Sequence, residues 1–279
     1  MELFEKDLQS PTLTSPLIRL ALRSATLAGC LALIAACKTA PLNTFKFTAD
    51  LPPGFAYVAA VYYVPEKGQT CTVDRRDNLA PVFNSKWRTD YKPDAEITIR
   101  KTVKGCPLVV RRIELEINSA YGKDWSDFSR DEAMVFIRDD LEEQFKGVFN
   151  EAGESTFHGQ CEWWFRTSGK PRILRKILDC RTVDVQGARA YGKTFGAFNP
   201  DQLPGKTVRM KITLAAEERP AIKDTWVKVP NGWKRCMGDN FEDQYAFCYG
   251  NYTDFSGFQM PDGQQCTIYP GCTEKKVSP

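Results

Sequence analysis

The stretch 159–181 constrains the fold more than any other part of the chain, because its apolar residues, its cysteines and a turn sequence all fit one β-hairpin. A turn centred between Lys170 and Pro171 would place Cys161 opposite Cys180, where cross-strand side chains lie close together. The same register forms three further pairs, Trp163 with Leu178, Phe165 with Lys176, and Thr167 with Leu174. The period of the apolar residues in 173–178 also suits a helix, but the hairpin explains more of the pattern.

Four further segments have the composition or the alternation of β-strands: 54–64, 96–103, 108–118 and 207–214. In the third of these, charged residues separate Ile113, Leu115 and Ile117, as in an antiparallel strand with one solvated face. Cys71 precedes the second segment and Cys106 follows it, so a bridge between them is expected. These segments predict a mainly β fold, with an antiparallel β-sandwich-like body over residues 51–216.

One segment departs from this pattern and predicts an amphipathic helix over about 130–146. The run 129–132 matches a capping box. Four apolar residues follow at i, i+4 spacing, and Gly147 is a natural stop: Ala133, Ile137, Leu141 and Phe145. The outer face of this helix would be acidic and include Asp139 and Asp140. Such a face is either simply solvated or a contact for a partner.

The segment 217–279 differs in composition and is expected to form a separate C-terminal unit. It holds ten aromatic residues between Trp226 and Tyr269, together with four cysteines. About 60 residues bury little core alone, so disulfides would be needed to stabilise the unit. The short spacings favour Cys236 with Cys248 and Cys266 with Cys272, although four cysteines allow three pairings. The aromatic residues form either a stapled core or a ligand platform.

Little catalytic chemistry is visible, and we expect no enzyme activity, cofactor or metal. His158 is the only histidine, and no Gly-x-Ser-x-Gly elbow or phosphate-binding glycine loop is present. A pair of carboxylates that meets only in the folded chain remains the alternative. The net charge of +3 is no signature of nucleic-acid binding.

A basic stretch accompanies the predicted hairpin. It contains eight cations against two carboxylates: Arg166, Lys170, Arg172, Arg175, Lys176, Arg181, Arg189 and Lys193. Such a stretch suits anionic head groups, an acidic partner, or ordinary solvated strand faces.

The N-terminal segment 1–36 resembles the signal peptide of a bacterial lipoprotein. A region with Lys6, Arg19 and Arg23 precedes an uncharged run from Ser24 to Ala36, which is too short to span a bilayer. Leu33-Ile34-Ala35-Ala36-Cys37 resembles a lipobox, whose cysteine becomes lipidated.

Leu27-Ala28-Gly29-Cys30 is a competing lipobox, but it leaves too short an apolar region. Lipidation of Cys37 also leaves an even number of later cysteines, eight, for disulfides. An ordinary secretory signal is the remaining alternative. The resemblance implies a lipid anchor, a tether over 37–50 and, with Lys38 after the cysteine, an outer-membrane protein facing the periplasm.

The C-terminal third resembles lipoproteins that act as immunity proteins against lipase effectors of type VI secretion. The resemblance rests on Trp226, Val229-Pro230, Gly232-Trp233-Lys234-Arg235-Cys236, Phe247-Cys248-Tyr249-Gly250 and the run 266–272. It implies a protein that binds a phospholipase in the periplasm and blocks it. Candidate partner contacts are Trp164, Arg166, Arg175, Trp226 and Trp233, besides the two aspartates of the expected helix. A glycan- or peptidoglycan-binding module and a structural outer-membrane lipoprotein are the alternatives.

Overall fold

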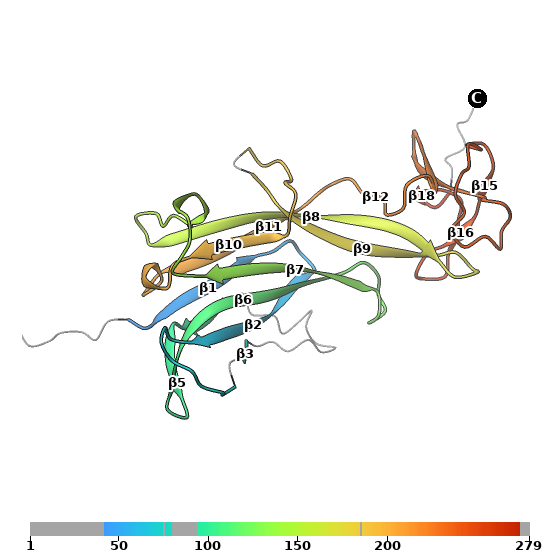
Figure 1. The fold of residues 1–279 in the computed structure, drawn as a ribbon. Coiled ribbons are helices and arrows are strands. Elements are labelled where there is room, and N and C mark those ends of the chain that lie inside the picture. Colours follow the sequence, from blue (N-terminus) through green and yellow to red (C-terminus); the bar gives the residue numbers. More distant parts are fainter. Residues whose placement is uncertain (1–41, 75, 80–93, 185, 274–279) are drawn as a thin grey trace, which may run out of the picture. The chain divides into compact units, whose positions relative to one another are not determined.

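The computed structural model describes residues 42–74, 76–79, 94–184 and 186–273, and its elements belong to one compact unit, Asn43–Pro279. The described chain is mainly β, in two large sheets and one small one (Figure 1). The N-terminal strands are β1 (Thr44–Asp50), β2 (Phe55–Pro65), β3 (Arg76–Leu79), β4 (Asp94–Thr98), β5 (Arg100–Val103), β6 (Cys106–Ala120) and β7 (Phe128–Ile137). The hairpin and its neighbours are β8 (Glu154–Ser168), β9 (Ile173–Thr182), β10 (Thr194–Phe198), β11 (Thr207–Leu214) and β12 (Arg219–Pro220). The C-terminal strands are β13 (Trp226–Val229), β14 (Gly232–Cys236), β15 (Phe255–Ser256), β16 (Phe258–Gln259), β17 (Gln265–Cys266) and β18 (Tyr269–Pro270).

The two large sheets share one hydrophobic core. One sheet has the order β17-β16-β9-β8-β11-β1-β4, with β12 paired to β8, and the other has the order β10-β7-β6-β2-β3, with β5 paired to β6. Alternate side chains of both sheets point inward and become buried, as period-2 patterning requires. Phe47 of β1, Ile113 of β6 and Val208 of β11 are examples. The composition of 54–64 and the alternation in 108–118 and 207–214 therefore predicted strands correctly.

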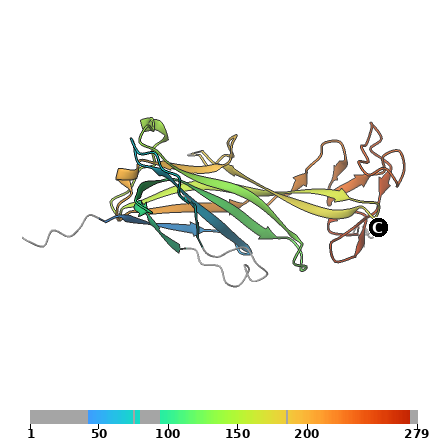
Figure 2. The same ribbon diagram turned by 60° about the horizontal axis from the view of Figure 1, so that its bottom comes forward.

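The hairpin predicted over 159–181 is confirmed with its register. Cys161 lies opposite Cys180, and the three other expected pairs are also present. All four expected cysteine pairs lie at disulfide distance: Cys71–Cys106, Cys161–Cys180, Cys236–Cys248 and Cys266–Cys272. In Figures 1 and 2 the far ends of β8 and β9 continue beyond the neighbouring strands and meet the C-terminal strands.

The segment 96–103 forms two strands, because the chain changes sheet at Ile99. β4 pairs with β1 in one sheet, whereas β5 pairs with β6 in the other. The fully buried Ile99 lies at the corner, where its N–H donates to Asn43 and its carbonyl accepts from Val110.

The helix expected over about 130–146 is wrong. Residues 128–137 form β7, which pairs with β6, and a short 3₁₀ turn follows at Glu143–Phe145. The residues of the supposed capping box have another role, because the Ser129 hydroxyl accepts from the N–H of Leu178 and the Asp131 carboxylate from that of Cys180. These side chains satisfy backbone donors on the edge of β9 that β8 does not cover. The i, i+4 apolar spacing indicated a helix, but the segment is a strand whose alternate residues face inward.

The tether predicted over 37–50 is wrong for its second half, because Thr44–Asp50 forms β1 between β11 and β4. Phe45, Phe47 and Ala49 are buried along one face of this strand. The first part of the tether and both candidate lipidation sites, Cys30 and Cys37, lie outside the described residues.

One hydrophobic cluster contains residues from both sides of the boundary expected at residue 217. Phe165 and Leu174 of the hairpin pack with Trp226, Phe258 and Tyr269 of the C-terminal segment. Phe165 and Trp226 meet edge to face, with ring centroids 5.0 Å apart. The C-terminal unit is therefore built onto the end of the hairpin.

Candidate interaction surface

The residues expected to contact a partner do not gather in one place. Asp139 and Asp140 are exposed in the turn after β7 rather than on a helix. Trp226 is only 6% exposed and belongs to the shared cluster, so it is a core residue rather than an anchor. Trp233 is half-buried, with its ring centroid 6.0 Å from that of Phe165. Trp164 is half-buried on the outer face of β8, opposite Ile177.

The basic stretch of the hairpin is largely neutralised by other parts of the chain. Six of its eight cations form ion pairs: Lys170 with Glu242, Arg175 with Asp127, Lys176 with Glu218, Arg181 with Asp179, Arg189 with Glu162 and Asp179, and Lys193 with Asp131. Arg172 is buried among backbone carbonyls. Of the eight cations of this stretch, all of which the structure describes, Arg166 alone is exposed and without an ion pair.

Two buried carboxylates organise the arginines on the outer face of the hairpin. Glu162, 3% exposed, binds both Arg189 and Arg219. Burial alone would raise the pKa of Asp179, but hydrogen bonds from Arg181 and Arg189 outweigh this effect and lower that pKa below its ordinary value. The carboxylates of this network therefore neutralise the arginine charges to which a membrane or an acidic partner would bind.

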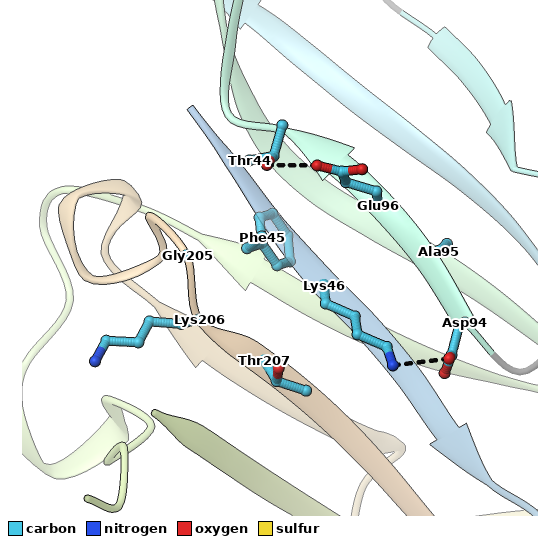
Figure 3. Close-up of a pocket in the computed structure, with 9 residues that line it drawn as sticks. All are labelled: Thr44, Phe45, Lys46, Asp94, Ala95, Glu96, Gly205, Lys206 and Thr207. Carbon is cyan, nitrogen blue, oxygen red and sulfur yellow. Dashed lines mark hydrogen bonds and ion pairs between the residues drawn. The ribbon is translucent and has the colours of Figure 1, made fainter. Parts of the chain in front are cut away.

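A polar hollow of about 390 Å³ lies over β1, β4 and the loop before β11 (Figure 3). Its charged groups mostly satisfy one another: Lys46 pairs with Asp94 at 2.7 Å, and the Thr44 hydroxyl donates to Glu96 at 2.7 Å. The hydroxyl of Thr48 also donates to Asp94. The hydrogen bonds from Lys46 and from Thr48 together lower the pKa of the Asp94 carboxyl group. The hollow is thus a neutralised sheet surface.

The loop between β14 and β15 presents an exposed row of rings, which we call the aromatic ridge: Tyr245, Phe247 and Tyr249. Tyr245 is 67% exposed and Tyr249 is 66% exposed. The rings of Tyr245 and Phe247 are nearly parallel, at 15° and 6.2 Å between centroids, and Phe247 lies 5.7 Å from Tyr249. Exposed aromatic side chains in a row are a typical feature of binding surfaces.

The ridge is held from behind by a buried arginine and a disulfide. Arg235, 2% exposed, donates to the carbonyls of Tyr245 at 2.6 Å and Ala246 at 2.8 Å. Cys248 is bonded to Cys236 of β14, and its N–H donates to the carbonyl of Asp224 at 2.7 Å. These contacts fix the backbone on both sides of Phe247 while its neighbours' rings remain exposed.

A second buried arginine, Arg172 at the hairpin turn, stabilises the start of the same loop. It is 1% exposed and donates to the carbonyls of Cys236, Met237, Asn240 and Asp243. Burial lowers the pKa of Arg172. Burial and the nearby Arg172 together lower the pKa of Arg235 to about 10, so both guanidinium groups are charged at neutral pH.

The sequence placed the ridge residues within the C-terminal aromatic segment but could not separate them from the core. The spacing of the ten aromatics does not distinguish buried from exposed rings, and only the turn-forming residues around 239–254 indicate an exposed loop. His158, the one histidine, is exposed on the outer face of β8. Among the described residues, no group of three His, Cys, Asp or Glu side chains is placed to hold a metal ion.

Comparison with known protein families, with curated proteins and with solved structures finds no match for this chain. In the described part of the chain, no helix has the length and apolar content needed to cross a bilayer.

Proposed function

We propose that this chain is a periplasm-facing outer-membrane lipoprotein that binds and neutralises a secreted toxic effector, a type VI phospholipase, and that the aromatic ridge contributes to the contact. The resemblance of the C-terminal third to immunity lipoproteins suggests the class of partner. In this proposal Cys37 carries the lipid, and the disulfides suit an oxidising compartment. The chain acts by binding rather than by catalysis.

The observation that carries this proposal is that the ridge is both exposed and immobilised. Aromatic side chains supply much of the binding energy at protein interfaces. A loop that is already ordered loses little conformational entropy on binding. Arg235 and the Cys236–Cys248 bond order this loop before any partner arrives.

The test first asks whether a neighbouring reading frame encodes a phospholipase with a Gly-x-Ser-x-Gly motif. Hydrolysis of phosphatidylcholine vesicles by that enzyme is then measured with and without this protein. We expect one-to-one inhibition, weakened at least tenfold when Tyr245 and Tyr249 are both replaced by alanine. Tyr191→Ala is the matched control, because Tyr191 is a fully exposed tyrosine outside the ridge. Inhibition that survives the double replacement would remove the ridge from the proposal, and absence of any complex would contradict the function itself.

Lipidation is tested separately by feeding cells a clickable fatty acid. We expect label on the native chain and on Cys30→Ser, and none on Cys37→Ser. Label that persists in Cys37→Ser and disappears in Cys30→Ser would move the anchor to the other cysteine.

A second candidate function is glycan binding, which is favoured by the nearly parallel rings of Tyr245 and Phe247. Sugar rings stack on such exposed aromatic faces. Titration with soluble peptidoglycan fragments, followed through the tyrosine ring signals in NMR spectra, distinguishes the two functions. Saturable shifts confined to Tyr245 and Tyr249 would favour the glycan.

A further inference from the structure

A crevice of about 150 Å³ lies where the end of β8 meets the C-terminal unit. One wall is formed by Arg166, Thr167 and Ser168, and the opposite side includes Trp226, Arg235 and Tyr245. The ridge residue Tyr245 therefore borders a small recess that is lined mainly by polar groups.

The surroundings of this crevice carry more positive than negative charge. The buried guanidinium groups of Arg172 and Arg235 donate to uncharged carbonyl and hydroxyl oxygens. Asp243 is the carboxylate whose charge acts on both of them, and it also accepts hydrogen bonds from backbone amides. Two buried cations thus share one carboxylate, and Arg166 adds a third positive charge at the mouth. A concave site with an excess of positive charge attracts anions.

Hydrogen-bond donors are available inside the crevice. The Thr167 hydroxyl accepts from Nε of Arg235 at 2.9 Å and lies on the opposite face of β8 from Arg166 and Ser168. The hydroxyl of Ser168 and the guanidinium of Arg166 are exposed at the same end of β8. The guanidinium of Arg166 and the hydroxyl of Ser168, two positions apart on the same face of β8, make a donor set suited to an oxyanion.

We propose that this crevice binds a phosphate group, held by Arg166 and Ser168 in the positive field of Arg172 and Arg235. The volume corresponds to roughly five water molecules, which suits a phosphate but is too small for a whole sugar or a lipid tail. Inorganic phosphate or a phosphate monoester also carries about −1.5 to −2 charges at neutral pH, which matches the excess better than a carboxylate does. The phosphate could be free or belong to a lipid head group. This site does not depend on a protein partner at the ridge.

The first test is an NMR titration of the full chain with inorganic phosphate, at constant ionic strength maintained with chloride. We expect saturable shifts in the backbone amides of Thr167, Ser168 and Tyr245. Arg166→Gln should weaken binding roughly tenfold or more, whereas Arg166→Lys should retain part of it. Arg138→Gln is the matched control, because Arg138 is an exposed arginine after β7. Equal binding in Arg166→Gln and the native chain would overturn the site, and equal binding of acetate and phosphate would overturn the assignment to phosphate.

The second test separates the two sources of phosphate. Co-sedimentation with vesicles of phosphatidic acid, whose head group is a phosphate monoester, that inorganic phosphate and Arg166→Gln both reduce would identify a lipid head group as the ligand. Binding of inorganic phosphate without such co-sedimentation would identify free phosphate. Vesicle binding that neither phosphate nor Arg166→Gln affects would contradict the lipid assignment, because the contact would then lie elsewhere.

Discussion

The two-sheet body and the C-terminal unit are stabilised in different ways. The body buries a continuous layer of aliphatic and aromatic side chains from both sheets. The C-terminal unit is held by a small aromatic cluster shared with the hairpin, by Arg235 of its own and Arg172 of the hairpin turn, which both bind backbone carbonyls, and by two disulfides. The difference shows how a segment too small to form its own core can still hold a loop in one conformation. Its irregular backbone is fixed by hydrogen bonds and covalent bonds rather than by burial.

The largest effect should come from the core of the body. Phe47→Ala removes a fully buried ring that packs edge to face on Tyr57 at 5.5 Å. We expect a loss of about 4 kcal/mol in the free energy of unfolding, measured by urea denaturation. Phe195→Ala, at a partly exposed ring, serves as the control and should cost much less. A small effect of Phe47→Ala would mean that the body does not depend on this core.

Arg235→Met should destabilise the C-terminal unit by about 3 kcal/mol and leave the body folded. The replacement keeps an unbranched apolar side chain but removes the guanidinium that donates to the carbonyls of Tyr245 and Ala246. Hydrogen exchange of amides in 226–256, compared with those of β6, measures the effect. Equal loss of protection in both regions would contradict the conclusion that the C-terminal unit and the body are stabilised separately.

Removal of the Cys236–Cys248 bond by replacing both cysteines with serine should cost about 2–3 kcal/mol, again mainly in the C-terminal unit. The Cys71–Cys106 pair in the body closes a longer loop, with a separation of 35 residues rather than 12. Loop entropy alone therefore predicts a loss about 1 kcal/mol larger when that pair is removed. Thermal unfolding of the two double variants compares the two losses of stability. A larger loss without Cys71–Cys106 would fit loop entropy, whereas a larger loss without Cys236–Cys248 would fit ordering of the ridge. Equal binding of the phospholipase by the Cys236–Cys248 variant would contradict a need for an ordered ridge.

The smallest effect concerns pH. The folded pKa of Asp179 lies below its unfolded value, so its ion pairs stabilise the body fully above the ordinary aspartate pKa. This contribution is lost as the pH falls through the folded pKa. Asp179→Asn should cost about 1 kcal/mol at neutral pH and reduce the acid-induced loss of stability. Asp140→Asn, at an exposed turn residue, should leave the acid transition unchanged; an equal response of the two variants would contradict the assignment.

The sequence predicted correctly those elements for which several independent sequence features required the same structure. The hairpin register followed because the apolar alternation, the turn and the positions of Cys161 and Cys180 all require the same pairing. The β7 segment failed because Ser129 and Asp131 satisfy strand donors through long-range contacts that local spacing does not reveal. The ridge could not be separated from the core because exposure of Tyr245 and Tyr249 depends on where Arg235 places the loop. Local patterns therefore determined the strands, and tertiary hydrogen bonds determined the surface.

The position of β1 has a mechanical consequence. This strand lies between β11, to which it is parallel, and β4, to which it is antiparallel. A pull on the chain just before Thr44, along the direction of the strand, is therefore resisted by two rows of backbone hydrogen bonds that must shear together. An anchored protein under load would hold at this strand, since no single row can peel away bond by bond while the other remains intact.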